Sequence, residues 1–249
     1  MRYPSKTVTE RTVTVSFSIV ITSLFSACDG RGSDACDDFD CSGHGECYLD
    51  EARATACRCD EGFVPQDMTC IPHDARCPID MMAIPGLSLC IDRFEVSRGE
   101  GDIAMSVKGV IPWVDVVWDE ARSVCEAAGK RLCTADEWLE ACRGPEGNTY
   151  AYGDEFEPLR CNGEEYAPEH DFVARTGTMP DCEGGYPGLN DMMGNAWEWT
   201  DDCDEYLCYY RGGGFGDTDV DIDCATLGMG APTVEYENVG FRCCKSFGE

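Results

Sequence analysis

The segment RGGGFGDTDVDIDCATLG, residues 211–228, carries four acids at alternating positions and then a cysteine. These residues are Asp217, Asp219, Asp221, Asp223 and Cys224. In a β-strand, residues two apart point to the same face, so the four carboxylates would lie side by side and repel one another. Three interpretations fit such a row: a solvated edge strand whose charge deters aggregation, an additional cation site, or a contact for a basic partner.

Cysteine is the second residue type with chemical capacity, at 19 of 249 residues. At this density the thiols either form disulfides or bind metal, and an oxidising compartment favours disulfides. The N-terminus favours export, because Arg2, Lys6 and Arg11 precede the apolar run VSFSIVITSLFSAC, which ends in small residues. This order predicts a signal peptide over residues 1–27. The run is short for a transmembrane anchor.

The sequence LFSAC resembles the box of bacterial lipoproteins, in which the cysteine after the cleavage site is acylated. Ser26 and Ala27 fit the box, although the leucine lies one place early and Phe25 stands in its position. We expect a lipid at Cys28, followed by a tether over residues 28–35, in an envelope lipoprotein. The alternative is plain secretion with Cys28 as a thiol. If Cys28 is acylated, the other cysteines are even in number and can all form disulfides.

The formal charge of −29 limits the choice of partners. Removal of residues 1–27 would take away three bases and one acid, so the mature chain would carry a charge of −31. Such a surface repels phosphate, which excludes nucleic acid as a partner. Calcium, or an unidentified protein or ligand at the cell envelope, is the expected companion.

Residues 36–70 hold six cysteines, with CSGHGEC and CRCDEGF among them. They resemble an EGF-like domain, and the resemblance implies the pairs Cys36–Cys47, Cys41–Cys57 and Cys59–Cys70. A module this small depends on such bridges, because it buries little apolar surface. Its GSDAC and CYLDEARATAC segments differ from the calcium-binding pattern of the family. We therefore expect a calcium-independent spacer or contact surface, followed by a linker over residues 71–76.

Residues 77–249 have the length of one compact domain. Two apolar stretches around a Pro-Gly turn predict a β-hairpin over residues 77–97, stapled by Cys77 and Cys90. Two helices follow in the sequence, and short β segments and glycine-rich loops fill the remainder. The composition of elements predicts an α+β domain.

Both helices carry end signals. The sequence DEARSVCEAAGK predicts a helix capped by Asp119 and ended by Gly129. The sequence TADEWLEACRG predicts a second helix, with a capping box between Thr134 and Glu137 and an end at Gly144.

Four motifs occur in order along this domain: AAGKRLCTADEWLEACRG, DMMGNAWEWTDD, RGGGF and VGFRCC. Together they resemble the formylglycine-generating enzyme family, also called sulfatase-modifying factors. The resemblance covers nearly all of residues 77–249 and implies a loop-rich, C-type-lectin-like fold. The residues themselves indicate structural roles: Trp197 and Trp199 share one strand face, Glu198 faces the other way, and Arg242 is expected to pair with a carboxylate while buried.

Active members of this family oxidise a client sulfatase cysteine to formylglycine with oxygen and copper. The family's chemistry requires two cysteines shortly after the RGGS motif, because Cu(I) prefers a close pair of thiolates. Here an ungapped alignment places Asp217 and Ile222 at those positions, and a short deletion instead matches Cys224 to a structural bridge. We therefore expect no catalytic residue, no copper site, and a binding or structural module. The alternative is an oxidase of sulfatase cysteine that uses a non-standard cysteine such as Cys224 or Cys244.

The resemblance also implies the disulfides Cys125–Cys243 and Cys142–Cys224. Elimination and local spacing suggest the remaining pairs of this domain, which are Cys77–Cys90, Cys133–Cys244, Cys161–Cys182 and Cys203–Cys208.

A calcium site is the last implication of the resemblance. It would use the side chain of Asp191, the carbonyls of Gly194 and Ala196, and the side chain of Glu198. Such oxygen donors suit a hard cation. A second, weaker calcium site would map to the residues Asn162, Gly163, Asp171 and Val173, where the loop EEYAPEHDFVA departs from the family in length.

Overall fold

The computed structural model describes residues 36, 39–50, 52–60, 62–66, 68–74, 76–166, 172–218 and 221–248. The predicted signal peptide, the tether and Cys28 lie outside these residues, and so do Asp171 and Asp219.

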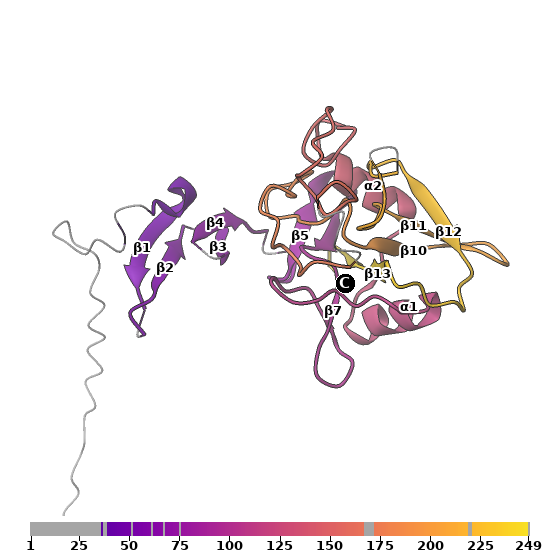
Figure 1. The fold of residues 1–249 in the computed structure, drawn as a ribbon. Coiled ribbons are helices and arrows are strands. Elements are labelled where there is room, and N and C mark those ends of the chain that lie inside the picture. The colour runs from indigo at the N-terminus through magenta and orange to yellow at the C-terminus, as the bar shows by residue number, and fades with distance from the viewer. Residues whose placement is uncertain are drawn as a thin grey trace, which may run out of the picture.

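The N-terminal described part is a small β unit with two antiparallel sheets (Figure 1). Its elements are the short 3-10 helix η1 (Cys41–Gly43) and the strands β1 (Gly45–Leu49), β2 (Thr55–Cys59), β3 (Phe63–Gln66) and β4 (Thr69–Pro72). Strand β1 pairs with β2, and β3 pairs with β4. Its core is largely disulfide sulfur, with Cys41, Cys57 and Cys70 buried. His44 stacks on Phe63 with ring centroids 4.0 Å apart, which is a structural role for the histidine.

The larger body contains two four-stranded sheets. The first has the strand order β5-β6-β14-β9. Its strands are β5 (Met81–Ile84), β6 (Leu89–Asp92), β9 (Arg131–Leu132) and β14 (Cys243–Ser246). Strands β5 and β6 form the predicted hairpin, turned by the 3-10 helix η2 (Pro85–Leu87).

The second sheet has the order β12-β11-β10-β13, with β12 at an edge (Figure 1). Its strands are β10 (Trp197–Cys203), β11 (Cys208–Arg211), β12 (Leu227–Gly230) and β13 (Val239–Phe241). Strand β13 runs parallel to β10, and the other neighbours are antiparallel. A small ribbon of β7 (Ser97–Arg98) and β8 (Ala104–Met105) completes the strands.

Two helices pack against these sheets, α1 (Trp118–Ala127) and α2 (Ala135–Arg143). Helix α2 begins and ends as predicted, with reciprocal hydrogen bonds between Thr134 and Glu137 and Gly144 after its last turn. The predicted cap of α1 is wrong. This helix begins one residue before Asp119, which therefore lies in the first turn, and the residue at the cap position is Val117. An acid in the first turn still interacts favourably with the helix dipole.

Two large apolar clusters and a smaller one around Cys77, Met81 and Cys90 form the core of the larger body in its described residues. One large cluster lies around α2 and contains Trp138, Leu189, Met192 and Ile222. The other lies around α1 and contains Trp197, Trp199 and Phe241. The mixed, loop-rich architecture agrees with the predicted α+β class.

Nine disulfides use eighteen of the nineteen cysteines. They are the nine pairs given above from the sequence. Adjacent Cys243 and Cys244 point to opposite faces of β14, so one reaches Cys125 in α1 and the other reaches Cys133. Among the described residues, no helix has both the length and the apolar character needed to cross a bilayer.

Candidate functional site

The loop that leads into β10 carries the residues expected to bind calcium. Its backbone adopts positive φ at Asp191, Gly194 and Asn195, so the loop folds tightly before the strand begins. Glycine adopts such angles freely, and aspartate and asparagine tolerate them better than other residues. The Asp191 side chain is buried, and its Oδ2 accepts a 2.6 Å hydrogen bond from the Gly177 N–H.

Glu198 lies on β10 with its side chain opposite to Trp197 and Trp199, as strand periodicity predicts. Its Oε2 accepts hydrogen bonds from Trp138 Nε1 at 2.5 Å and from Arg242 Nε at 2.6 Å. Its Oε1 accepts one from Arg242 Nη2 at 2.7 Å. The predicted buried ion pair of Arg242 is thus present, and it is bidentate.

Arg242 is fully buried and also binds backbone carbonyls. It donates to Asp92 at 2.9 Å, to Asn190 at 3.0 Å and to Asp191 at 3.2 Å. Burial alone would lower the pKa of Arg242, but the adjacent charge of Glu198 outweighs it and raises the pKa. One guanidinium, between β13 and β14, therefore ties β10 and the end of β6 to the loop that contains Asp191.

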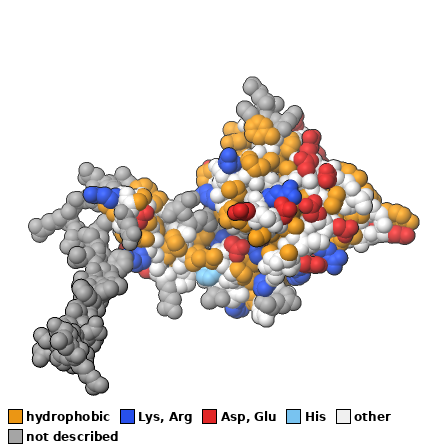
Figure 2. Space-filling model, turned by 90° about the horizontal axis from the view of Figure 1, so that it is seen from below, with side chains coloured by type: hydrophobic (Ala, Val, Ile, Leu, Met, Phe, Trp, Pro, Cys, Tyr) orange, Lys and Arg blue, Asp and Glu red, His pale blue; other side chains and the backbone are white. Residues whose placement is uncertain are grey.

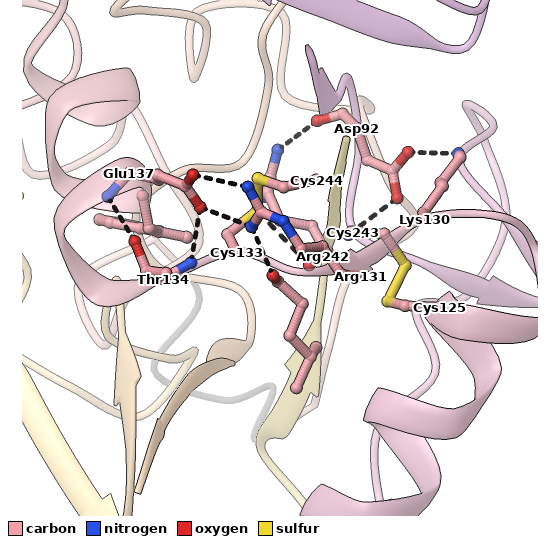
Figure 3. The surroundings of a disulfide bond; sticks show 12 residues. Asp92, Cys125, Lys130, Arg131, Cys133, Thr134, Glu137, Arg242, Cys243 and Cys244 are labelled. Carbon is pink, nitrogen blue, oxygen red and sulfur yellow. Dashed lines mark hydrogen bonds and ion pairs between the residues drawn. A yellow bond between two sulfur atoms is a disulfide. The ribbon is translucent and has the colours of Figure 1, made fainter. Parts of the chain in front are cut away.

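Figure 3 shows a second ion pair on the other side of Asp92. Lys130 Nζ lies 2.6 Å from Asp92 Oδ1 and 2.6 Å from Asp80 Oδ2. The other Asp92 oxygen accepts from the Cys243 N–H at 2.9 Å. Burial raises the pKa of Asp92 to about 6, and the charge of Lys130 only partly opposes this.

Glu95 is a member of the site that the sequence analysis did not find. It is fully buried, and its Oε1 accepts from the Ala196 N–H at 3.0 Å. Its Oε2 accepts from the Asn195 side-chain amide at 2.7 Å. Burial raises the pKa of Glu95 well above its ordinary value, and the charges of Asp191 and Glu198 raise it further. The only local signal is an acid between two buried apolar residues, Phe94 and Val96.

Charge balance indicates what this cluster can hold. Glu95, Asp191 and Glu198 are buried beside the buried guanidinium of Arg242, and the charge of the exposed Lys108 also acts on Asp191. Full ionisation of the three acids therefore leaves a buried excess of negative charge among the described residues. Such an excess is costly in a low-dielectric interior unless the groups bind protons or a cation. Burial raises the pKa of Asp191 to about 6, in agreement with this strain.

The donor types at this loop suit a divalent hard cation. The cluster offers carboxylate oxygens and the backbone carbonyls of a tight loop, which are the ligands calcium prefers. Glu198 Oε1 accepts one hydrogen bond, and Asp191 is bonded through Oδ2, so each side chain keeps acceptor capacity among the described residues. Bound calcium would supply the missing positive charge and hold the loop against β10.

The second candidate site is only partly described, because Asp171 lies outside the described residues. Asn162 Nδ2 donates to Asn195 Oδ1 at 2.9 Å and to the Phe172 carbonyl at 3.3 Å. The Asn195 N–H donates to the Asn162 carbonyl at 2.7 Å. Gly163 is buried and faces Ile222, while Val173 is half-buried. Asn195 thus joins the two predicted loops.

The aspartate row does not form a strand in its described residues. The chain turns through residues 215–218 and 221–225, and β12 begins only at Leu227. Asp217 turns inward and accepts from Trp197 Nε1 at 2.6 Å and from the Gly214 N–H at 2.8 Å. Asp223 accepts from the backbone and the side chain of Thr226, whereas Asp221 is exposed. The expectation of one carboxylate-lined face is therefore wrong.

The positions aligned with the family's catalytic cysteines have no thiol. Asp217 is half-buried, and burial raises its pKa although the Gly214 and Trp197 hydrogen bonds lower it. Ile222 lies in the apolar cluster around α2. Cys224 is buried in its disulfide with Cys142. Every cysteine among the described residues is in a disulfide, including the close group Cys41, Cys57 and Cys70.

The fold and the site together define a disulfide-rich, loop-rich α+β domain with a buried acidic cluster. The family described as "Sulfatase-modifying factor enzyme 1-like domain" matches residues 86–247, and the chain belongs to this family. Its architecture is the C-type-lectin-like fold expected from the motifs. PvdO from Pseudomonas aeruginosa has a similar structure, with a TM-score of 0.51 and 16% identity over 64% of this chain and 80% of that chain.

Two curated relatives show how the sequence compares within the family. The chain is 34% identical over 156 residues to the inactive C-alpha-formylglycine-generating enzyme 2 of Bos taurus, covering 55% of this chain and 51% of that protein. It is 30% identical over 177 residues to the formylglycine-generating enzyme of Bos taurus, covering 53% of this chain and 43% of that protein. The chain thus spans about half the length of these relatives or less.

Proposed function

We propose that this protein is an exported, non-catalytic binding module of the formylglycine-generating enzyme family. The observation that carries the proposal is that all described cysteines are in disulfides, and an ungapped alignment with the family further places Asp217 and Ile222 at the positions of the catalytic thiol pair. A carboxylate and an alkyl group offer neither a nucleophilic sulfur nor a soft ligand for Cu(I). Similarity to a relative named as inactive supports the same conclusion.

Residues 36–70 act in this proposal as an EGF-like spacer or contact surface. A lipid on Cys28 would attach the chain to the cell envelope. Nine disulfides are typical of a protein that folds in an oxidising compartment, which supports export.

An oxidase that uses Cys224 or Cys244 is the competing function. Both sulfurs are fully buried in disulfides, with Cys142 and Cys133 respectively. Either disulfide would have to be reduced before a thiolate existed to bind copper or attack a substrate.

The test of function is incubation of the exported chain with a peptide that carries the sulfatase cysteine motif, together with Cu(I) and oxygen. An active formylglycine-generating enzyme serves as the positive control. We expect the peptide mass to stay unchanged. Conversion of the peptide cysteine to formylglycine would contradict the proposal.

The role of calcium in this module is to stabilise the loop before β10. It would bind Asp191, the carbonyls of Gly194 and Ala196, and Glu198, and it would neutralise the buried excess of negative charge. A ligand that binds only the folded state raises the free energy of unfolding, by about 2.7 kcal/mol at a hundredfold excess over its dissociation constant. We therefore expect calcium to raise the Tm and a chelator to lower it.

Two matched variants make the calcium test specific. Asp191 and Asp115 both have positive φ, but Asp191 is buried and Asp115 is exposed. Asp191→Asn should weaken calcium stabilisation because it removes a charge, whereas Asp115→Asn should leave it unchanged. Equal Tm values for the native chain with millimolar calcium and with chelator would count against the site.

A further inference from the structure

Strand β12 is an open sheet edge with apolar side chains. Among the described residues it pairs only with β11, in the order β12-β11-β10-β13. Leu227 is 43% exposed and Met229 is 53% exposed, and residues two apart share a face. The strand sequence LGMG contains no charge and no proline, the devices that usually prevent edge pairing. The Met229 carbonyl already accepts from Tyr210 Oη at 3.0 Å, so a further strand would pair through the other backbone groups of this edge.

The two glycines of β12 fix its other face against aromatic rings. A Cβ at Gly228 would lie 2.0 Å from the Tyr210 ring, and one at Gly230 would lie 2.8 Å from the Tyr236 ring. Any larger residue would push the strand off these rings. The close packing holds β12 flat against the sheet, so its edge is presented in a fixed position.

A stapled hairpin tip extends this surface at the Gly230 end. Cys208 pairs in register with Gly230, and the disulfide to Cys203 closes the tip between β10 and β11. Asp204 Oδ1 accepts from the Tyr206 N–H at 2.7 Å and from the Leu207 N–H at 2.8 Å. These two bonds lower the pKa of Asp204, so the carboxylate stays charged and the loop stays closed.

The ordered tip presents a large aromatic side chain to solvent. Tyr206 is 70% exposed, although ordinary folding would favour covering its ring. Exposed tyrosines on rigid supports are common anchors in protein interfaces, because binding costs them little conformational entropy. In Figure 1 this hairpin projects from the body beyond β12, and in Figure 2 hydrophobic and acidic side chains lie together at that end.

Acidic residues outnumber basic ones around this edge. Asp204 and Glu205 lie at the tip, and Glu235 and Glu237 follow β12, whereas Asp201 and Asp202 at the base of the hairpin already contact Arg122 and the Ala135 N–H. Between Arg175 and Arg242 the sequence has a single basic residue, Arg211, and its side chain is buried. A partner for this surface must therefore be basic to gain electrostatic attraction. A second copy of this chain, with its net charge of −29, would be repelled.

We propose that the β12 edge and the Cys203–Cys208 hairpin tip form a docking surface for a basic, extended segment of a partner protein. The segment adds to the sheet as a further strand beside β12. Its alternate aliphatic side chains contact Leu227, Met229 and Tyr206, and its basic side chains face the acids of the tip. The inference rests on the proposed binding function, because it names the partner chemistry of that module.

The experiment uses the exported chain and a fluorescein-labelled peptide of alternating valine and lysine. Fluorescence anisotropy at physiological ionic strength gives the Kd. Two control peptides keep the length: one alternates valine and glutamate, and the other is the valine–lysine peptide with N-methylated backbone amides. We expect binding of the parent peptide, about tenfold weaker binding after N-methylation, because the strand hydrogen bonds are lost, and no binding of the acidic peptide.

Substitutions locate the surface. Met229→Lys should weaken binding about tenfold, because it removes an apolar anchor and adds a repelling charge. Ile103→Lys, at another residue that is 59% exposed, is the matched control and should have no effect. Tyr206→Ala should also weaken binding, whereas Tyr166→Ala should not. Circular dichroism of each variant confirms that the fold is intact.

Three results would overturn the proposal: no binding of the basic peptide, equal affinity for the parent and N-methylated peptides, or equal effects of Met229→Lys and Ile103→Lys. Sedimentation of the unliganded chain as a dimer that Met229→Lys dissociates would also overturn it, and would assign the edge to a second copy. The peptide-binding experiment is independent of the sulfatase-peptide experiment. Failure of the basic peptide to bind would refute the docking surface, whereas only conversion of the sulfatase peptide would refute the non-catalytic function.

Discussion

At the scale of single residues, Arg242 is the side chain on which most of the buried site depends. It neutralises Glu198 and binds three carbonyls from two other segments. The sequence predicted a carboxylate partner for Arg242 and placed Glu198 on the strand face opposite two tryptophans, but only the structure shows that Glu198 is this partner. The sequence could not predict Glu95, whose partners lie a hundred residues away in the chain and form only when the loop folds over it.

Replacement of Arg242 is expected to be strongly destabilising. Arg242→Met removes the cation and leaves Glu198 buried without its partner, so the free energy of unfolding should fall by about 3–5 kcal/mol. Arg122→Met is the control, because Arg122 pairs with Glu126 on the exposed face of α1 and should contribute at most about 1 kcal/mol. Guanidinium unfolding with the disulfides intact measures both. Similar losses for the two variants would contradict the assigned role.

Asp92 makes stability depend on pH. Its pKa rises from 3.8 to about 6 on folding because of burial. The folded state therefore holds a proton that the unfolded chain has already released, and this stability is present below about pH 4 and is lost as pH rises through about 6. Relative to the Asp92→Asn variant, the free energy of unfolding of the native chain should fall by up to about 3 kcal/mol between these pH values. If the difference in free energy of unfolding between the two proteins does not change with pH, the raised pKa of Asp92 is refuted.

At the scale of elements, the sequence predicted what local patterns specify. The β5–β6 hairpin and helix α2 follow from apolar spacing, the Pro-Gly turn and the capping box. Alternating aspartates are compatible with turns as well as with a strand, so the prediction of a strand over this row was wrong. Asp217 is drawn inward by Trp197 and Gly214, and this contact depends on the position of β10 rather than on the row itself. The predicted cap residue of α1 was wrong because the helix starts one residue before Asp119.

The capping box gives a direct check on α2. Thr134→Ala removes the side-chain acceptor of the Glu137 N–H and should lower the free energy of unfolding by about 1 kcal/mol. Thr178→Ala is a suitable control, since Thr178 is exposed and lies outside any helix. The Thr178→Ala variant should lose less free energy of unfolding than the Thr134→Ala variant. Thermal unfolding compares the two, and an equal effect would argue against the cap.

At the scale of the whole molecule, cross-links and charge determine what the chain can do. Disulfides join α1 to β14, α2 to the segment before β12, and the two strands of the projecting hairpin. The family's fold depends on buried tryptophans, Arg242 and disulfides rather than on a reactive thiol, so the fold is compatible with the proposed non-catalytic function. The strongly acidic surface that remains is suited to binding cations and basic partners.

The central claim is that the mature chain keeps no thiolate pair for copper. Alkylation of the native, unreduced protein, followed by mass spectrometric disulfide mapping with and without Cu(I), tests it most directly. We expect no alkylated cysteine between residues 36 and 244, the nine disulfides described above, and no tight binding of Cu(I). Two alkylated cysteines that become protected when Cu(I) is added would contradict it.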